Sequence, residues 1–143
     1  QTLYQEDLLR EKIDFFFFFF QSEIQICADE KMLSQVFINL VKNAIQALTE
    51  QADKKIHMEV YNKGMTLFMK ITDNGSGVPS DLVEDIFIPF FTTKTSGTGI
   101  GLSLSRQIIR MHGGELSVIS QPYHETSFII SLPLNSHRSF SAR

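Results

Sequence analysis

The chain has 143 residues, of which 43% are hydrophobic and 20% are charged, and its formal net charge is −3. This size predicts one domain with a core of its own, and the weak acidity excludes the strongly basic surface that binds nucleic acid or an anionic membrane. The single cysteine excludes an internal disulfide and no Cys/His spacing suggests zinc, so we expect a reducing, cytosolic setting.

The first residues carry no sign of a membrane segment. The longest apolar run, Phe15–Phe20, is much shorter than the roughly 20 residues that span a bilayer, and no signal peptide is visible. Because the chain begins at Gln1 rather than Met, we expect a fragment of a longer protein whose membrane anchor or sensory module would lie elsewhere. Residues 1–14 are predicted to be a linker or the end of a preceding helix. Residues 15–26 read as extended, and the phenylalanine run predicts a buried strand covered on both faces.

Asp29 is the predicted N-cap of a long helix over residues 30–50, since it precedes a run of apolar residues at helical spacing. Asn39 and Asn43 lie four residues apart beside this apolar stripe, so their side chains share a face. Asparagine is a mediocre helix former, and its amide oxygen can ligate a hard cation such as Mg²⁺. The pair therefore indicates either amides that reach into a polar groove or a solvated helix flank.

Two alternating segments, residues 55–61 and 66–72, flank a turn at residues 62–64 and predict a β-hairpin. Asp73 follows the second strand directly and begins the sequence Asp-Asn-Gly-Ser-Gly, which ends at Gly77. A carboxylate at a strand end, next to two flexible glycines, can accept a hydrogen bond from an exocyclic amino group while the backbone passes close to a flat ring. Asp, Asn, Gly and Ser are also the usual turn formers, so an ordinary turn is the alternative.

Residues 79–86 are predicted to form a short helix with proline near its start, and residues 87–99 have no periodicity. Within the second stretch, Phe90 and Phe91 are too apolar for a free loop, so we expect them to anchor it to the core. Lys94 lies just ahead of a glycine-rich stretch, where its ammonium could meet a terminal phosphate. The alternative for Lys94 is a solvated surface lysine.

Gly97, Gly99 and Gly101 alternate with small or β-branched residues, and a predicted helix over residues 101–112 follows at once. Glycines let a ligand approach the main chain, and a helix N-terminus presents unpaired N–H groups and a positive dipole, which together suit a polyphosphate. A plain surface loop is the alternative. Gly113 and Gly114 are the expected end of the helix.

Residues 115–121 and 126–134 are predicted to form a closing pair of strands, and residues 135–143 a polar tail. The hairpins and the two principal helices together predict an α+β protein. Its expected architecture is a two-layer α/β sandwich, with one mixed, mostly antiparallel sheet and helices on one face.

The order of the polar motifs is more specific than any one of them. Asn39 with Asn43, residues 73–77, Phe90 with Phe91, and residues 97–101 resemble, in this order and spacing, the N, G1, F and G2 boxes of the histidine-kinase catalytic domain. That family belongs to the Bergerat-fold superfamily, shared with gyrase-type, MutL-type and heat-shock-chaperone ATPases, and the similarity covers about residues 15–134. The stretch from Phe91 to Gly97 is short for an ATP lid, and in this it resembles the nitrogen-regulation branch of these kinases, whose motifs are similar to residues 89–94. Neither a G-x-x-x-x-G-K-[ST] loop nor the H-R-D and D-F-G set is present.

The resemblance implies roles for individual residues. Asn43 would ligate Mg²⁺, Asp73 would bind the adenine amino group, and Gly75 and Gly77 would shape the adenine pocket. Other matched positions would form the hinge of an ATP lid, meet the phosphates or assist adenine binding, namely Thr93, Lys94, Gly97, Thr98, Gly99, Gly101, Leu102 and Thr126.

Asn39 argues against a hydrolytic member of this superfamily. Hydrolytic relatives normally carry a carboxylate, as general base, one turn before the Mg²⁺-ligating asparagine, whereas Asn39 is an amide without basicity. Phosphoryl transfer depends mainly on positioning and charge neutralisation, so a kinase can manage with a histidine nucleophile. No histidine of the chain lies in the H-[ED]-x-x-[PN] context of a phosphoacceptor. We expect His57 to be structural, in a strand, and His112 to be a helix cap.

The resemblance therefore implies the ATP-binding catalytic domain of a two-component sensor histidine kinase, with ATP and Mg²⁺ as cofactors and with Asn39, Asn43 and Lys94 as catalytic residues. The domain would transfer the γ-phosphoryl group to a histidine on a dimerisation domain outside these residues, in a homodimer. A response-regulator receiver domain would be a further partner, and the domain would be cytoplasmic, with any membrane anchor elsewhere in the full-length protein. The alternatives are a nucleotide-binding regulatory module without phosphoryl transfer and a gyrase-, MutL- or chaperone-type ATPase.

Overall fold

The computed structural model describes residues 13–19, 28–49, 51–90, 101–121 and 124–134. The elements are, in chain order, β1 (Asp14–Phe19), α2 (Glu30–Ala47), β2 (Lys55–Lys63), β3 (Thr66–Asp73), the 3₁₀ turns η1 (Ser80–Leu82) and η2 (Asp85–Phe87), α3 (Gly101–Met111), β4 (Glu115–Gln121) and β5 (Glu125–Pro133). The strands form a five-stranded sheet in the order β1-β2-β3-β5-β4. β1 is parallel to β2 and the other neighbours are antiparallel, which confirms the predicted mixed, mostly antiparallel α+β fold.

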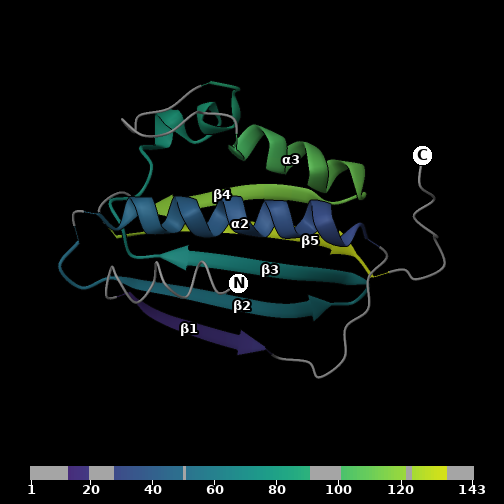
Figure 1. Cartoon of the computed structure of the whole chain (residues 1–143), viewed down its shortest axis with the longest axis horizontal. Coiled ribbons are helices and arrows are strands. Elements are labelled where there is room, and N and C mark those ends of the chain that lie inside the picture. The colour runs from purple at the N-terminus through teal and green to yellow at the C-terminus, as the bar shows by residue number, and fades with distance from the viewer. Residues whose placement is uncertain (1–12, 20–27, 50, 91–100, 122–123, 135–143) are drawn as a thin grey trace.

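Helices α2 and α3 cover one face of this sheet (Figure 1). Alternate residues of β2 are buried and face the helices, because successive side chains of a strand point to opposite faces. The apolar stripe of α2 packs against them through Val36, Leu40 and Ala44. The core of this two-layer sandwich also contains Ile56, Met58, Val60, Leu67, Ile71, Ile108, Ile109, Leu116, Phe128, Ile130 and Leu132.

The ends of α2 follow from its sequence. The Asp29 side chain accepts the Met32 N–H at 3.0 Å, so the predicted N-cap is confirmed. The helix ends at Ala47 rather than at residue 50. The Leu48 N–H bonds to the Ile45 carbonyl at 3.1 Å and tightens the last turn, which stops the helix early.

Two glycines end α3, as predicted. The Gly113 N–H donates to the Arg110 carbonyl and the Gly114 N–H to the Ile109 carbonyl, each at 3.0 Å. Gly113 has φ +79, and this left-handed conformation with the two bonds is a Schellman motif. A Cβ on Gly114 would collide with the Ser131 carbonyl oxygen, so only glycine lets β4 begin this close to β5.

Two predictions for the chain between these helices and at the edge strand are wrong. Residues 79–86 form only the short turns η1 and η2, because so few residues barely repay the cost of nucleating an α-helix. Strand β1 is not buried on both faces. It lies at the edge of the sheet, and the described phenylalanine side chains from Phe15 to Phe18 are 36% to 54% exposed. Phe16 stacks on His57 of β2 at 4.7 Å, consistent with the structural role expected of His57.

The remaining sequence-based boundaries lie outside the described part of the chain. These are the leading segment before residue 13, the continuation of the first strand over residues 20–26, and the polar tail over residues 135–143. The division into a leading segment, a domain over residues 15–134 and a tail stays a prediction.

Candidate nucleotide-binding site

Asp73 lies at the C-terminal end of β3 and is almost completely buried, with 2% of its surface exposed. Its Oδ1 accepts the Gly75 N–H at 2.9 Å, which orients the carboxylate in a tight turn. In the sheet register Asp73 faces Thr126 of β5, which is also buried. A buried aspartate costs free energy unless polar groups surround it, and the Gly75 N–H is one such group. The ordinary turn that was the alternative from the sequence is therefore present, and it contains a buried acidic side chain.

The glycines after Asp73 let the loop pass against the end of α2. A Cβ on Gly75 would lie 2.5 Å from the Ala47 carbonyl oxygen, so a side chain here would force the loop away from the helix. Gly77 has φ +80, a conformation that favours glycine. Because Asn43 lies one turn before Ala47 on the same face of α2, this packing also brings the Asn43 region next to the Asp73 loop.

A hydroxyl pair holds the other side of this region. Ser120 Oγ of β4 lies 3.2 Å from Thr126 Oγ1, and it accepts the Val78 N–H at 2.6 Å. This contact ties the chain after Gly77 to the last two strands. Sequence reasoning missed Ser120, although its place opposite Thr126 in the closing hairpin could have indicated it.

Asn39 joins the two helices. Its Nδ2 donates to the Gly101 carbonyl at 3.3 Å and to Ser105 Oγ at 3.1 Å, while its Oδ1 accepts from Gln35 Nε2 at 3.1 Å. Gly101 begins α3, and Leu102 packs partly buried against the core. The Asn39 amide is thus directed at the first turn of α3, where the predicted phosphate-binding helix N-terminus begins.

The structure therefore brings the predicted site residues together in two groups. Asp73, Gly75, Gly77 and Thr126 form one group at the ends of β3 and β5, and Asn39 and Gly101 form the other. Asn43 is half-buried on α2, which contacts both groups. Thr93, Lys94, Gly97, Thr98 and Gly99 lie outside the described residues.

The predicted aromatic anchor is displaced by three residues. Phe90 is 74% exposed and has φ +67, so its assignment as a core anchor is wrong, and Phe91 lies outside the described residues. Phe87, at the end of η2, is the buried ring and belongs to the core cluster. A spacing argument cannot separate Phe87 from Phe90, because this stretch has no periodicity.

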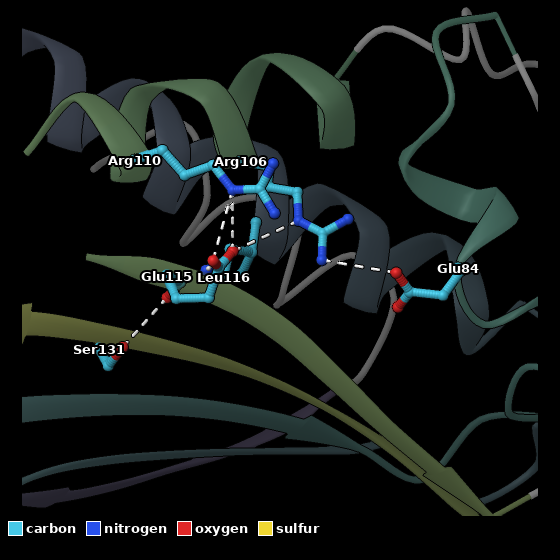
Figure 2. A network of polar contacts seen from close by, with 6 residues as sticks. All are labelled: Glu84, Arg106, Arg110, Glu115, Leu116 and Ser131. Carbon is cyan, nitrogen blue, oxygen red and sulfur yellow. Dashed lines mark hydrogen bonds and ion pairs between the residues drawn. The ribbon is translucent and has the colours of Figure 1, made fainter. Parts of the chain in front are cut away.

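A network of charged side chains lies beside α3 (Figure 2). Arg106 and Arg110 both contact Glu115, at 3.4 Å and 3.1 Å, and Arg106 also reaches Glu84 at 3.7 Å. Partial burial raises the pKa of the Glu115 carboxyl, but the hydrogen bond from Arg110, the Leu116 N–H and the two guanidinium groups outweigh it. The pKa of Glu115 therefore lies below its ordinary value.

His112 caps the end of α3, as predicted, but as a neutral ring. Its Nε2 accepts the Asp29 N–H at 3.0 Å, so this nitrogen carries no proton, and its Nδ1 donates to the Ile108 carbonyl at 2.8 Å. The cap thus works through hydrogen bonds to both helices rather than through a positive charge on the helix dipole.

One side chain, that of Asn43, is the predicted ligand of a magnesium ion. Within the described residues, no group of three or more His, Cys, Asp or Glu side chains could hold a metal on its own. The Asn43 amide oxygen is a ligand of the kind that Mg²⁺ takes, and Mg²⁺ usually combines one or two protein ligands with substrate phosphates and water.

Among the helices of the described residues, none is both long and apolar enough to cross a membrane.

The fold and the site agree with the class of protein that the sequence resembles. A two-layer sandwich with a buried carboxylate in a glycine turn, beside a helix that starts at a glycine, is the arrangement expected of an ATP-binding domain of that family. Residues 28–136 match the family described as histidine kinase-, DNA gyrase B-, and HSP90-like ATPases, and the chain belongs to this family.

Within this family, the chain is similar to sensor histidine kinases. The chain is 42% identical over 110 residues to the signal transduction histidine-protein kinase AtoS of Escherichia coli, which covers 77% of this chain and 18% of AtoS. It is 39% identical over 122 residues to the sensory histidine kinase/phosphatase NtrB of Rhizobium meliloti, covering 76% of this chain and 32% of NtrB. The chain therefore spans about a fifth to a third of the length of these relatives.

Solved structures agree. The catalytic domain of the histidine kinase ThkA superposes with a TM-score of 0.84 at 36% identity, over 93% of this chain and 86% of that domain. ThkA in complex with the response regulator protein TrrA superposes with a TM-score of 0.81 at 32% identity, over 96% of this chain and 39% of that one. The resemblance to histidine-kinase catalytic domains is confirmed.

Proposed function

We propose that this chain is the ATP-binding catalytic domain of a two-component sensor histidine kinase, and that it transfers the γ-phosphoryl group of ATP to a histidine on a dimerisation domain outside these residues. The observation that carries the proposal is the buried Asp73 carboxylate, oriented by the Gly75 N–H and placed beside Thr126. A carboxylate so held can accept a hydrogen bond from the exocyclic amine of adenine, and the Thr126 hydroxyl can assist at the neighbouring ring edge. The sequence and structural similarity to sensor histidine kinases supports the same conclusion.

The remaining roles follow the same division of the site. Asn43 ligates Mg²⁺, which when bound neutralises negative charge on the phosphates. The N-terminus of α3 provides N–H groups and dipole for the phosphates, with the family's lid positions completing this part of the site: Thr93, Lys94, Gly97, Thr98, Gly99, Gly101 and Leu102.

Asn39 favours transfer over hydrolysis in this proposal. As an amide it cannot activate water at neutral pH, and its hydrogen bonds to Gly101 and Ser105 hold the start of α3 in place. The acceptor is then a histidine imidazole, which needs positioning more than it needs a base.

The partners follow from the proposed reaction. The phosphoacceptor histidine lies on the protein's own dimerisation domain, in a homodimer, and a response-regulator receiver domain takes the phosphoryl group onward. The complex of ThkA with TrrA supports the second partner. Nucleic acid is not a partner, and the domain is cytoplasmic.

Adenine recognition is tested by binding. Mg-ATP at about 100 times its dissociation constant should raise the free energy of unfolding of the chain by about 2.7 kcal/mol, and GTP should bind much more weakly because guanine has a carbonyl where adenine has its amine. Asp73→Asn should weaken ATP binding, whereas the control Asp81→Asn, on exposed η1, should not. Equal affinity of the native chain for ATP and GTP would contradict the role of Asp73.

Phosphoryl transfer is tested with radiolabelled ATP. The chain alone should neither label itself nor release phosphate steadily, and the longer protein with its dimerisation domain should acquire an acid-labile, base-stable label on histidine. Asn43→Ala should abolish this label. Steady phosphate release by the chain alone would favour a hydrolytic ATPase, and ATP binding without label in the longer protein would favour a regulatory module.

A further inference from the structure

Arg106 contacts residues of the segment before its own helix and of the strand after it (Figure 2). It belongs to α3, and its guanidinium carbon lies 4.0 Å from the ring centre of Phe87 in η2. Its Nη2 lies 3.7 Å from Glu84 Oε1, just before η2, and its Nε lies 3.4 Å from Glu115 Oε1 at the start of β4. One side chain therefore joins α3 to the residues before it in the chain and to the sheet.

Burial indicates which of these contacts matters most. The Arg106 side chain is only 19% exposed, whereas that of Glu84 is 78% exposed. An ion pair with so exposed a partner contributes little, because water screens it. The stacking of the guanidinium on the buried Phe87 ring is desolvated, and cation–π contacts are strongest there. The contact with Phe87 should therefore contribute more than the ion pair with Glu84.

Each of the two segments that Arg106 joins is connected to one group of residues of the candidate site. The segment that contains Phe87 follows the Asp73 loop along the chain and is fastened near its beginning by the Val78 N–H bond to Ser120. Helix α3 begins at Gly101, whose carbonyl accepts from Asn39. Arg106 therefore links the segment that follows the Asp73 loop to the helix that begins at Gly101.

We propose that Arg106 is a positioning residue for nucleotide binding, which holds the segment following the adenine loop in register with the helix that faces the phosphates. This inference rests on the proposed function. It predicts a specific defect, because misalignment of two half-sites weakens a ligand that spans both more than a ligand that contacts one.

The test compares Arg106→Met, which keeps an unbranched apolar stem against Phe87, with the matched control Arg110→Met. Arg110 lies one turn later on α3 and also contacts Glu115, at 3.1 Å. Arg106→Met should raise the dissociation constant for Mg-ATP about tenfold, and that for adenosine less than about twofold. Arg110→Met should change both less than about twofold.

Two further variants make the result decisive. Arg106→Lys keeps the charge over the ring and should recover most of the ATP affinity, although it loses the planar fork. Phe87→Leu removes the ring but largely fills its space, and it should reproduce the selective loss of ATP affinity if Arg106→Met does not fold. Equal loss of ATP and adenosine, or equal affinities in Arg106→Met and Arg110→Met, would overturn the positioning role. Failure of the native chain to bind Mg-ATP would instead refute the proposed function, and this inference with it.

Discussion

Replacing Asn39 with alanine should remove the hydrogen bonds between α2 and the start of α3, and the resulting loss in the free energy of unfolding can be estimated. The side chain donates two hydrogen bonds across the helix pair, to the Gly101 carbonyl and to Ser105 Oγ. At about 0.5–1.5 kcal/mol for each net hydrogen bond, the pair contributes about 1–3 kcal/mol. Alanine returns up to about 0.7 kcal/mol through its higher helix propensity, so Asn39→Ala should lower the free energy of unfolding by about 0.3–2.3 kcal/mol. Ser105 is fully buried, which favours the upper part of this range because its hydroxyl loses a partner.

Urea unfolding monitored by circular dichroism measures this difference, with Gln35→Ala as the matched control. Gln35 contributes only an exposed hydrogen bond to Asn39 on the same helix, so its removal should change stability by less than about 0.5 kcal/mol. Asn39→Asp should cost more than Asn39→Ala, since a carboxylate cannot donate to the Gly101 carbonyl and repels it. Equal unfolding midpoints for Asn39→Ala and Gln35→Ala would show that the interhelical bonds contribute nothing.

Three other substitutions have expected outcomes. Gly75→Ala should destabilise the chain by about 1–3 kcal/mol in urea unfolding, since the new Cβ would lie 2.5 Å from the Ala47 carbonyl oxygen. Gly101→Ala should leave stability unchanged or raise it by up to about 1 kcal/mol, because its nearest neighbour would lie at an ordinary 3.6 Å, and a loss as large as that of Gly75→Ala would contradict this packing. Glu115→Gln should destabilise the chain above pH 5 and lose this effect in acid. The folded-state pKa of Glu115 is lowered, so its contribution is present above the unfolded carboxyl pKa of about 4.3 and disappears as pH falls through the folded value. A stability difference between native chain and Glu115→Gln that does not change with pH would refute this assignment.

The sequence predicted the elements whose signals are local. The cap at Asp29, the apolar spacing of α2 and the glycines after α3 each act within a turn or two of the chain, and the structure has all of them. The alternation in β2 and β3 predicted their pairing for the same reason. The predicted burial of the phenylalanine run was wrong, because burial depends on where a strand lies in the sheet. Strand β1 pairs with β2 on one side only, and no pattern within six phenylalanines encodes an edge position.

The same distinction, between local sequence signals and contacts that depend on the fold, applies to the candidate site. The order of motifs led to Asp73, Gly75 and Thr126, which the structure places together. The residues that support them were missed because their contacts with the segment before α3 are not encoded locally: Ser120 accepts from the Val78 N–H, and Arg106 lies over Phe87. Ser120 is an ordinary strand serine until β4 pairs with β5, and Arg106 is an ordinary helical arginine until η2 folds beneath it.

Hydrogen bonds hold the two ends of α3 against α2, and the two contact points are separated by similar lengths along each helix. His112 meets Asp29 at one end, and Asn39 meets Gly101 at the other. From Asp29 to Asn39 a helix rises about 15 Å, and from Gly101 to His112 about 16.5 Å, at about 1.5 Å for each residue. The helices must therefore run antiparallel with their fastened ends aligned. Since His112 accepts from a backbone N–H and donates to a carbonyl, and Asn39 donates to a carbonyl, this alignment depends on short, directional hydrogen bonds as well as apolar packing. A substitution at His112, at the far end from Asp73, should thus shift α3 and, through the helix itself, displace Gly101 relative to Asn39 at the candidate site.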